Sequence, residues 1–120
     1  MVNSLQHPGC VSSATAADGL KLALEIANPA GAPTLLFAHG FGQTRGAWTA
    51  TASALADQGC RCVSFDYRGH GESGHAPGGA YHIEQFADDL VRVARAQPQP
   101  PVLVGASMGG LLGLVSAAEA

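Results

Sequence analysis

The sequence predicts an α/β domain in which an N-terminal β-hairpin is followed by parallel strands with flanking helices. Three observations lead to this prediction. The dipeptide Asp18-Gly19 separates two segments of strand-like composition, a strong hairpin signal. Short, continuous apolar runs follow, as in strands that are covered on both faces. Longer helical segments lie between these runs, and this alternation of strands and helices favours a parallel sheet.

The hairpin strands are expected at residues 11–17 and 20–26. In the second strand Leu20, Leu22 and Leu24 alternate with smaller or more polar residues, as in a strand with one buried face. A loop rich in proline, glycine and alanine then leads to an apolar strand. This third strand is expected at residues 34–38.

Helices and strands alternate over the rest of the chain. The expected elements are a helix at 47–58, a strand at 61–65, a helix at 83–96, a strand at 102–106 and a helix from Met108 onward. Gly59 follows the first of these helices as a suitable C-terminal cap. The helix at 83–96 is amphipathic because its apolar residues recur every three or four positions, and Asp88 and Asp89 are assigned to its solvated face.

Composition restricts the classes of partner and location. The chain has 120 residues and a net charge of −3 with scattered basic residues, so one domain is expected and nucleic acid is not a predicted partner. No apolar run approaches the roughly 20 residues of a membrane helix, so no membrane is expected either. Residues 1–10 lack the features of a secretory signal and are interpreted as a flexible tail. The three cysteines favour reduced thiols in a cytoplasmic protein over a disulfide or a metal site.

The segment Gly105-Ala106-Ser107-Met108-Gly109 carries the strongest chemical signal. It stands between an apolar strand and an apolar helix, and a serine flanked by glycines in that position is typical of a nucleophile elbow. The turn is tight, so its flanking positions need residues without bulk. The alternative interpretation is a serine in an ordinary glycine-rich turn.

A serine nucleophile also needs hydrogen-bond donors for the oxyanion that forms on the attacked carbonyl. The backbone N–H of Met108, at the start of a helix, is one candidate donor. The segment His39-Gly40-Phe41-Gly42 directly follows the strand at 34–38, and its glycines would let the Phe41 N–H face the site.

These motifs make the chain resemble the N-terminal part of an α/β-hydrolase. Three segments match in order, namely residues 39–42, 66–73 (Asp-Tyr-Arg-Gly-His-Gly-Glu-Ser) and 105–110. The resemblance implies a partial α/β-hydrolase fold, with residues 11–120 as the N-terminal portion of a domain truncated after the nucleophile helix. It also implies that Ser107 is the nucleophile, that Phe41 and Met108 supply the oxyanion hole, and that residues 66–73 shape a loop without a catalytic role.

The chain departs from this family in one respect. The family order is serine, then acid, then histidine, but the thirteen residues after Ser107 contain no histidine and a single carboxylate, Glu119. The five histidines, at positions 7, 39, 70, 75 and 82, all precede the serine. No acid and no base are therefore assigned within this chain. Because loss of a triad histidine costs about 10⁶ in turnover, we expect the 120 residues alone to be inactive or nearly so.

The resemblance implies hydrolysis of a small acyl substrate, either an ester, a thioester or a lactone, with no cofactor and no metal. Cofactor-independent haloperoxidases, carbon–carbon bond hydrolases and acyltransferases share the motifs, so these reactions stay open. Three interpretations of the chain compete. It is a truncated serine hydrolase, half of a split enzyme that another chain completes, or a non-catalytic binding or interaction module. An uncovered edge of the strand at 102–106 would favour self-association or a complementing chain.

Overall fold

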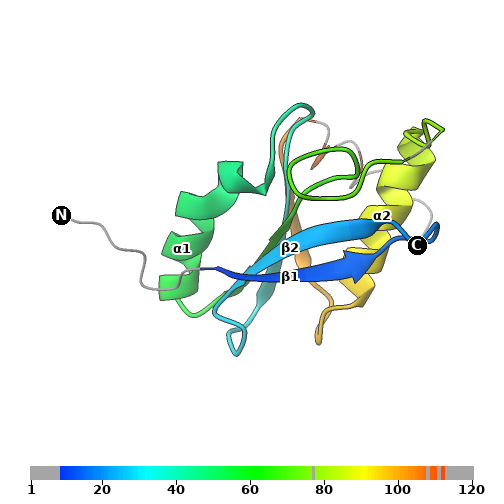
Figure 1. Cartoon of the computed structure of the whole chain (residues 1–120). Helices are drawn as coiled ribbons and strands as arrows, with labels where there is room; N and C mark the ends of the chain where they lie inside the picture. The colour runs from blue at the N-terminus through cyan, green and yellow to red at the C-terminus, as the bar shows by residue number, and fades with distance from the viewer. Residues whose placement is uncertain (1–8, 77, 108, 111, 113–120) are drawn as a thin grey trace.

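A five-stranded mixed sheet forms the centre of the molecule (Figure 1). The computed structural model describes residues 9–76, 78–107, 109, 110 and 112. The strands are β1 (Cys10–Thr15), β2 (Lys21–Ala27), β3 (Thr34–Ala38), β4 (Arg61–Phe65) and β5 (Val102–Gly105). Their order across the sheet is β1-β2-β4-β3-β5. β2 is antiparallel to both β1 and β4, whereas β3 is parallel to β4 and β5, which confirms the predicted α/β class.

Two helices cover the sheet from opposite faces (Figure 1). α1 (Thr49–Asp57) packs on one face behind the short 3-10 helix η1 (Arg45–Trp48), and α2 (Ile83–Arg95) packs on the other. Side chains alternate between the two faces along each strand, so Cys62 joins the α1 side whereas Val63 and Phe65 join the α2 side. α2 contributes Phe86 and Leu90 to the larger of the two cores. Each such buried side chain stabilises the fold by about 1.5–3 kcal/mol.

Several element boundaries differ from the prediction. The expected helix at 47–58 is divided into η1 and α1, and α1 ends one residue early, where Gly59 takes the left-handed φ of +100° that a C-terminal cap needs. Cys10, predicted to lie in the tail, belongs to β1, while residues 1–8 lie outside the described residues. β5 ends at Gly105 because the chain turns sharply at Ser107. Within the described residues no helix is both long and apolar enough to cross a membrane.

Candidate active site

Three loops lie together at one end of the sheet, beyond the carboxyl ends of β3, β4 and β5. The parallel register places Ala38 beside both Phe65 and Gly105, so the chain leaves all three strands at the same level. The segments that follow contain the three sequence motifs, at residues 39–42, 66–73 and 105–110. In open α/β sheets, ligands bind beyond the carboxyl ends of the strands.

Ser107, the predicted nucleophile, has a left-handed backbone conformation. Its φ is +55°, and among the described residues Asn28 is the only other non-glycine residue with a positive φ. Such a left-handed conformation costs a side-chain-bearing residue about 1–3 kcal/mol. The chain then enters a helical turn, in which the Gly109 N–H donates to the Ala106 carbonyl at 3.0 Å and the Gly110 N–H to that of Ser107 at 3.1 Å. The serine is exposed, and its hydroxyl makes no hydrogen bond within the described part of the chain.

The flanking glycines are required by close packing. A Cβ atom at Gly109 would lie 2.3 Å from the carbonyl oxygen of Ala38, and one at Gly105 would lie 2.5 Å from the carbonyl carbon of Gly109. Ala38 also accepts a hydrogen bond from the Ala106 N–H at 3.3 Å. The elbow therefore packs directly on the end of β3, and larger residues at 105 or 109 would push it away.

The loop after β3 is held by a buried histidine. Nδ1 of His39 lies 2.7 Å from the Gly40 carbonyl oxygen, and Nε2 accepts the Tyr67 N–H at 3.1 Å. Burial lowers the pKa of His39, so its imidazole is neutral and carries its proton on Nδ1, where it donates to Gly40. Both ring nitrogens are thus occupied by backbone groups. His39 therefore has a structural role, because it links the loops after β3 and β4.

The Phe41 backbone stands at the exposed tip of the same loop. Gly42 has a φ of +82° and donates its N–H to His70 Nε2 at 3.3 Å, while the Gly40 N–H donates to the side-chain oxygen of Gln43 at 3.1 Å. Among the described residues the N–H of Phe41 has no acceptor. Met108, the other predicted oxyanion donor, lies outside the described residues.

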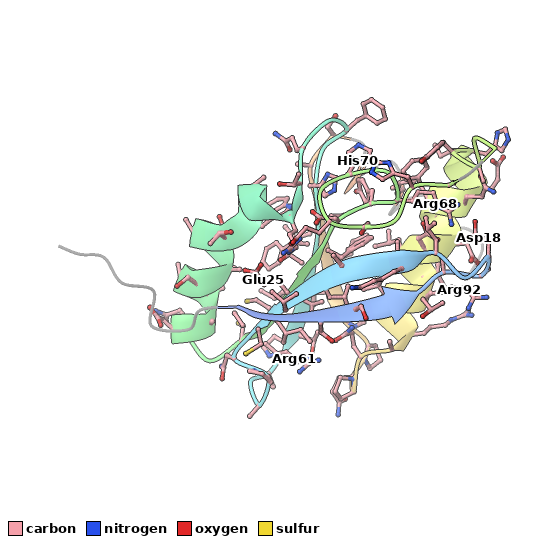
Figure 2. The ribbon with its side chains drawn as sticks, in the orientation of Figure 1. Asp18, Glu25, Arg61, Arg68, His70 and Arg92 are labelled. Carbon is pink, nitrogen blue, oxygen red and sulfur yellow. The ribbon has the colours of Figure 1, made fainter. Side chains whose placement is uncertain are left out.

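The described histidines offer Ser107 no free base. His70 stands in the loop after β4 (Figure 2), where its Nδ1 donates to the Arg68 carbonyl oxygen at 3.0 Å and its Nε2 accepts from Gly42. His39 is occupied as described above. His75 and His82 are exposed, and no described histidine hydrogen-bonds to Ser107. The described residues also contain no group of three potential ligands that could hold a metal ion.

The loop at 66–73 is organised around the buried carboxylate of Asp66. Its Oδ1 accepts the Arg45 N–H at 2.7 Å, and its Oδ2 accepts the Glu72 N–H at 3.0 Å and an ion pair from the Arg45 side chain. Arg45 also pairs with Glu25 and Glu72. Burial alone would lower the pKa of Arg45, but its hydrogen bonds to Glu72 and Asp66 outweigh that effect and raise it. Local sequence patterns do not reveal this role of Arg45, because its partners are distant along the chain.

A second buried ion pair corrects the prediction for Asp89. The sequence pattern assigned this residue to the solvated face of a helix, but it is only 1% exposed and binds Arg68 at 2.7 and 2.9 Å. Arg68 also reaches Asp18 of the β1–β2 turn at 3.0 Å, and the two lie side by side in Figure 2. Asp88 does lie on the exposed face, paired with Arg92. Asp89 is buried because Arg68, the buried cation of the 66–73 loop, faces α2 at this point.

Comparison with known proteins agrees with this geometry. The model of the alpha/beta hydrolase fold family matches residues 33–120. The proline iminopeptidase PfmaB from Pestalotiopsis fici is 37% identical over 100 residues, which cover 79% of this chain and 34% of that protein. The thioesterase domain from the curacin biosynthetic pathway is 32% identical with a TM-score of 0.86, over 92% of this chain and 40% of that one. Epoxide hydrolase VrEH1 from Vigna radiata shares the fold at 23% identity and a TM-score of 0.84, over 96% and 35% of the two chains.

The chain thus spans 34% to 40% of the length of these three proteins. The family match covers most of the described residues and includes all three loops of the candidate site. The strand order and the left-handed serine after β5 agree with it. The chain belongs to the α/β-hydrolase family.

Proposed function

We propose that the chain carries the nucleophile and the oxyanion hole of a serine-type acyl hydrolase that acts on esters, thioesters or lactones. Ser107 attacks the acyl carbonyl, and the N–H groups of Phe41 and Met108 bind the negative charge that develops on its oxygen. The observation that carries the proposal is the exposed, left-handed Ser107 between β5 and a helical turn. Strain of this kind is retained where a side chain must be presented to a substrate.

Similarity to known hydrolases supports this reaction class. The iminopeptidase and the thioesterase domain are hydrolases by name, and both exceed 30% identity with this chain. The epoxide hydrolase, at 23% identity, supports the fold alone. The proposal also keeps the cytoplasmic location expected from the sequence, because the free thiols of Cys10, Cys60 and Cys62 are typical of a reducing compartment.

The proposal includes the inactivity of the 120 residues by themselves. A serine hydroxyl needs a base within about 3 Å, and both ring nitrogens of His39 and of His70 are already bound to backbone groups. Without a base, only the oxyanion hole contributes, which retains about 10³–10⁴ over the reaction in water. The acid and the base of the working enzyme then come from outside the residues described.

The test supplies the missing base from solution. The purified chain is incubated with a fluorophosphonate probe, with and without imidazole, and the adduct is located by peptide mass spectrometry. We expect a slow adduct at Ser107, faster formation with imidazole, and no adduct in Ser107→Ala. The matched variant Ser13→Ala removes an exposed serine of ordinary strand geometry and should label like the wild type. If the wild type is labelled at another residue instead, and Ser107→Ala is labelled equally, Ser107 is refuted as the nucleophile. Rapid labelling without imidazole refutes the lack of a base.

A second candidate function follows from the edge of the sheet. β5 is an edge strand of the sheet that the described residues form, and its Val102 and Leu103 are 54% and 37% exposed. An apolar edge favours pairing with a strand of a second copy or of a complementing chain. A split enzyme completed in this way still predicts the imidazole-dependent adduct at Ser107, whereas a non-catalytic interaction module predicts none.

A further inference from the structure

A groove of about 620 Å³ lies between the β1–β2 hairpin and the second half of α2. Its apolar lining includes Leu24 and Ile26 of β2 and Val91 of α2, and the hydroxyl-bearing Ser12 of β1 stands opposite Leu24 in the strand register. No residue of the three loops at the candidate active site lines it. The groove is therefore separate from the site of the proposed acyl chemistry.

Positive charge is concentrated around this groove. Arg61 of β4 and Arg92 and Arg95 of α2 line it together with one carboxylate, Asp88. The whole chain has six lysines and arginines and a net charge of −3, so half of its cations meet here. Asp88 pairs with Arg92, but among the described residues Arg61 and Arg95 have no carboxylate partner. Excess cationic charge in a concave site attracts anions.

Arg61 is held in place by neutral groups. Its Nη1 donates to the Pro29 carbonyl oxygen at 2.8 Å and its Nη2 to the side-chain oxygen of Gln97 at 2.9 Å. Gln97 is anchored in turn, because its amide donates to the Val93 carbonyl oxygen at 2.9 Å. The Nε–H of Arg61 is buried and has no acceptor within the described residues. The guanidinium is thus oriented in advance while its charge stays uncompensated, as in a site built for an anion.

The helix dipole explains only part of this arrangement. Arg92 and Arg95 lie in the last turn of α2, where cations stabilise a helix. Arg61 comes from β4, on a different element, and gains nothing from that dipole. Figure 2 shows Arg61 beneath β1 and Arg92 near the end of that strand, and the groove lining includes both residues, which belong to different elements.

We propose that this groove binds a small amphipathic anion, with one carboxylate, phosphate or sulfate headgroup on an aliphatic or aromatic body. Arg61 and Arg95 bind the headgroup, and Leu24, Ile26 and Val91 contact the apolar body. Both parts of the ligand are needed, because the lining combines Arg61 and Arg95, which have no carboxylate partner among the described residues, with a few apolar side chains. The site is independent of the proposed acyl hydrolase activity.

The probe for the test is octyl phosphate below its micellar concentration, titrated into the ¹⁵N-labelled chain and followed by amide chemical shifts. Inorganic phosphate carries the headgroup alone, and octanol the body alone. We expect saturable shifts at Leu24, Val91 and Gln97 with octyl phosphate, and at least tenfold weaker binding of the two half-ligands. Arg61→Gln and Arg95→Gln should each weaken binding about tenfold, the effect of losing one charge-assisted hydrogen bond.

The control is Lys21→Gln, which removes one positive charge at an exposed residue that does not line the groove. It should bind octyl phosphate like the wild type. Equal weakening by Lys21→Gln, equal binding of octanol, or an absence of saturable shifts in the groove would overturn the proposal. If Arg61→Gln loses its amide dispersion, Arg95→Gln decides the outcome, because the Arg95 side chain is exposed and holds no carboxylate within the described residues.

Discussion

Alanine at Gly109 should destabilise the fold, whereas alanine at the adjacent Gly110 should not. A Cβ atom at Gly109 would lie 2.3 Å from the carbonyl oxygen, 2.9 Å from the carbonyl carbon and 3.0 Å from the Cβ of Ala38. These are atoms of β3 and cannot rotate away as the end of a long side chain would. Among the described residues, a Cβ atom at Gly110 meets nothing within 4 Å. The two variants add the same methyl group to neighbouring residues of one helical turn, so they form a matched pair.

The magnitude follows from the atoms displaced. Overpacking in a dense region costs about 1–3 kcal/mol. Moving the Ala38 carbonyl would also weaken its hydrogen bond from the Ala106 N–H, which contributes about 1 kcal/mol. Gly110→Ala removes a glycine from a helical position and should leave stability unchanged or raise it by up to about 1 kcal/mol. The two variants should therefore differ by roughly 3 kcal/mol, with Gly110→Ala the more stable.

Urea denaturation followed by far-ultraviolet circular dichroism measures this difference. With a slope of about 1–3 kcal/mol per molar urea, a gap of that size separates the two midpoints by at least ~1 M. A Gly109→Ala protein that is unfolded without urea gives the same answer, provided that Gly110→Ala still folds. Equal midpoints would refute the close approach of the elbow to β3, and the nucleophile assignment would lose its geometric basis.

Two further predictions concern buried charge. Arg68→Met should cost about 3–5 kcal/mol, because it leaves the Asp89 carboxylate buried without a counter-ion, and Arg68→Met combined with Asp89→Leu should regain most of that loss in thermal unfolding. Lowering the pH from about 7 to about 5 should also destabilise the fold through His39. Burial lowers its pKa below the ordinary 6.5, so its contribution is complete above pH 6.5 and is lost as the pH falls toward the folded-state pKa. Urea midpoints at the two pH values should depend less on pH in His39→Gln, whereas His75→Gln, at an exposed residue, should keep the wild-type dependence.

Local patterns were sufficient for most of the secondary structure. The strands at 34–38 and 61–65 have the predicted bounds, because continuous apolar runs between turn residues leave little freedom in their ends. The start of the helix predicted at 47–58 was wrong, because η1 begins at Arg45. Arg45 is held by Glu25 of β2 and by Asp66, which follows β4. The sequence around the helix does not indicate these contacts.

The candidate site shows the same division between local and distant information. The turn at Ser107 could be predicted because its glycines and its position between strand and helix are adjacent in sequence. The partner of Asp89 could not, because helical periodicity describes only which face a residue occupies and not whether a cation faces it. Asp18 was interpreted as a hairpin residue alone, yet its carboxylate also binds Arg68, fifty positions later. The arginines of the groove come from β4 and α2, so their proximity also depends on the tertiary fold.

The loop at 66–73 acts on the candidate site through the loop after β3. Asp66 orients its own loop by accepting the N–H of Glu72, and a Cβ atom at Gly71 would lie 2.3 Å from that carboxylate. The loop so fixed carries His70, whose Nε2 accepts the Gly42 N–H and whose ring packs edge-on against Phe41 at 5.3 Å. The orientation of the Phe41 N–H, the proposed oxyanion donor, thus depends on a histidine that contacts no reacting atom. His70→Ala should therefore lower the imidazole-dependent labelling of Ser107 while the chain stays folded, and His70→Gln, which keeps an acceptor for Gly42, should restore part of it. Unchanged labelling in His70→Ala would show that the loop holds its shape without this contact.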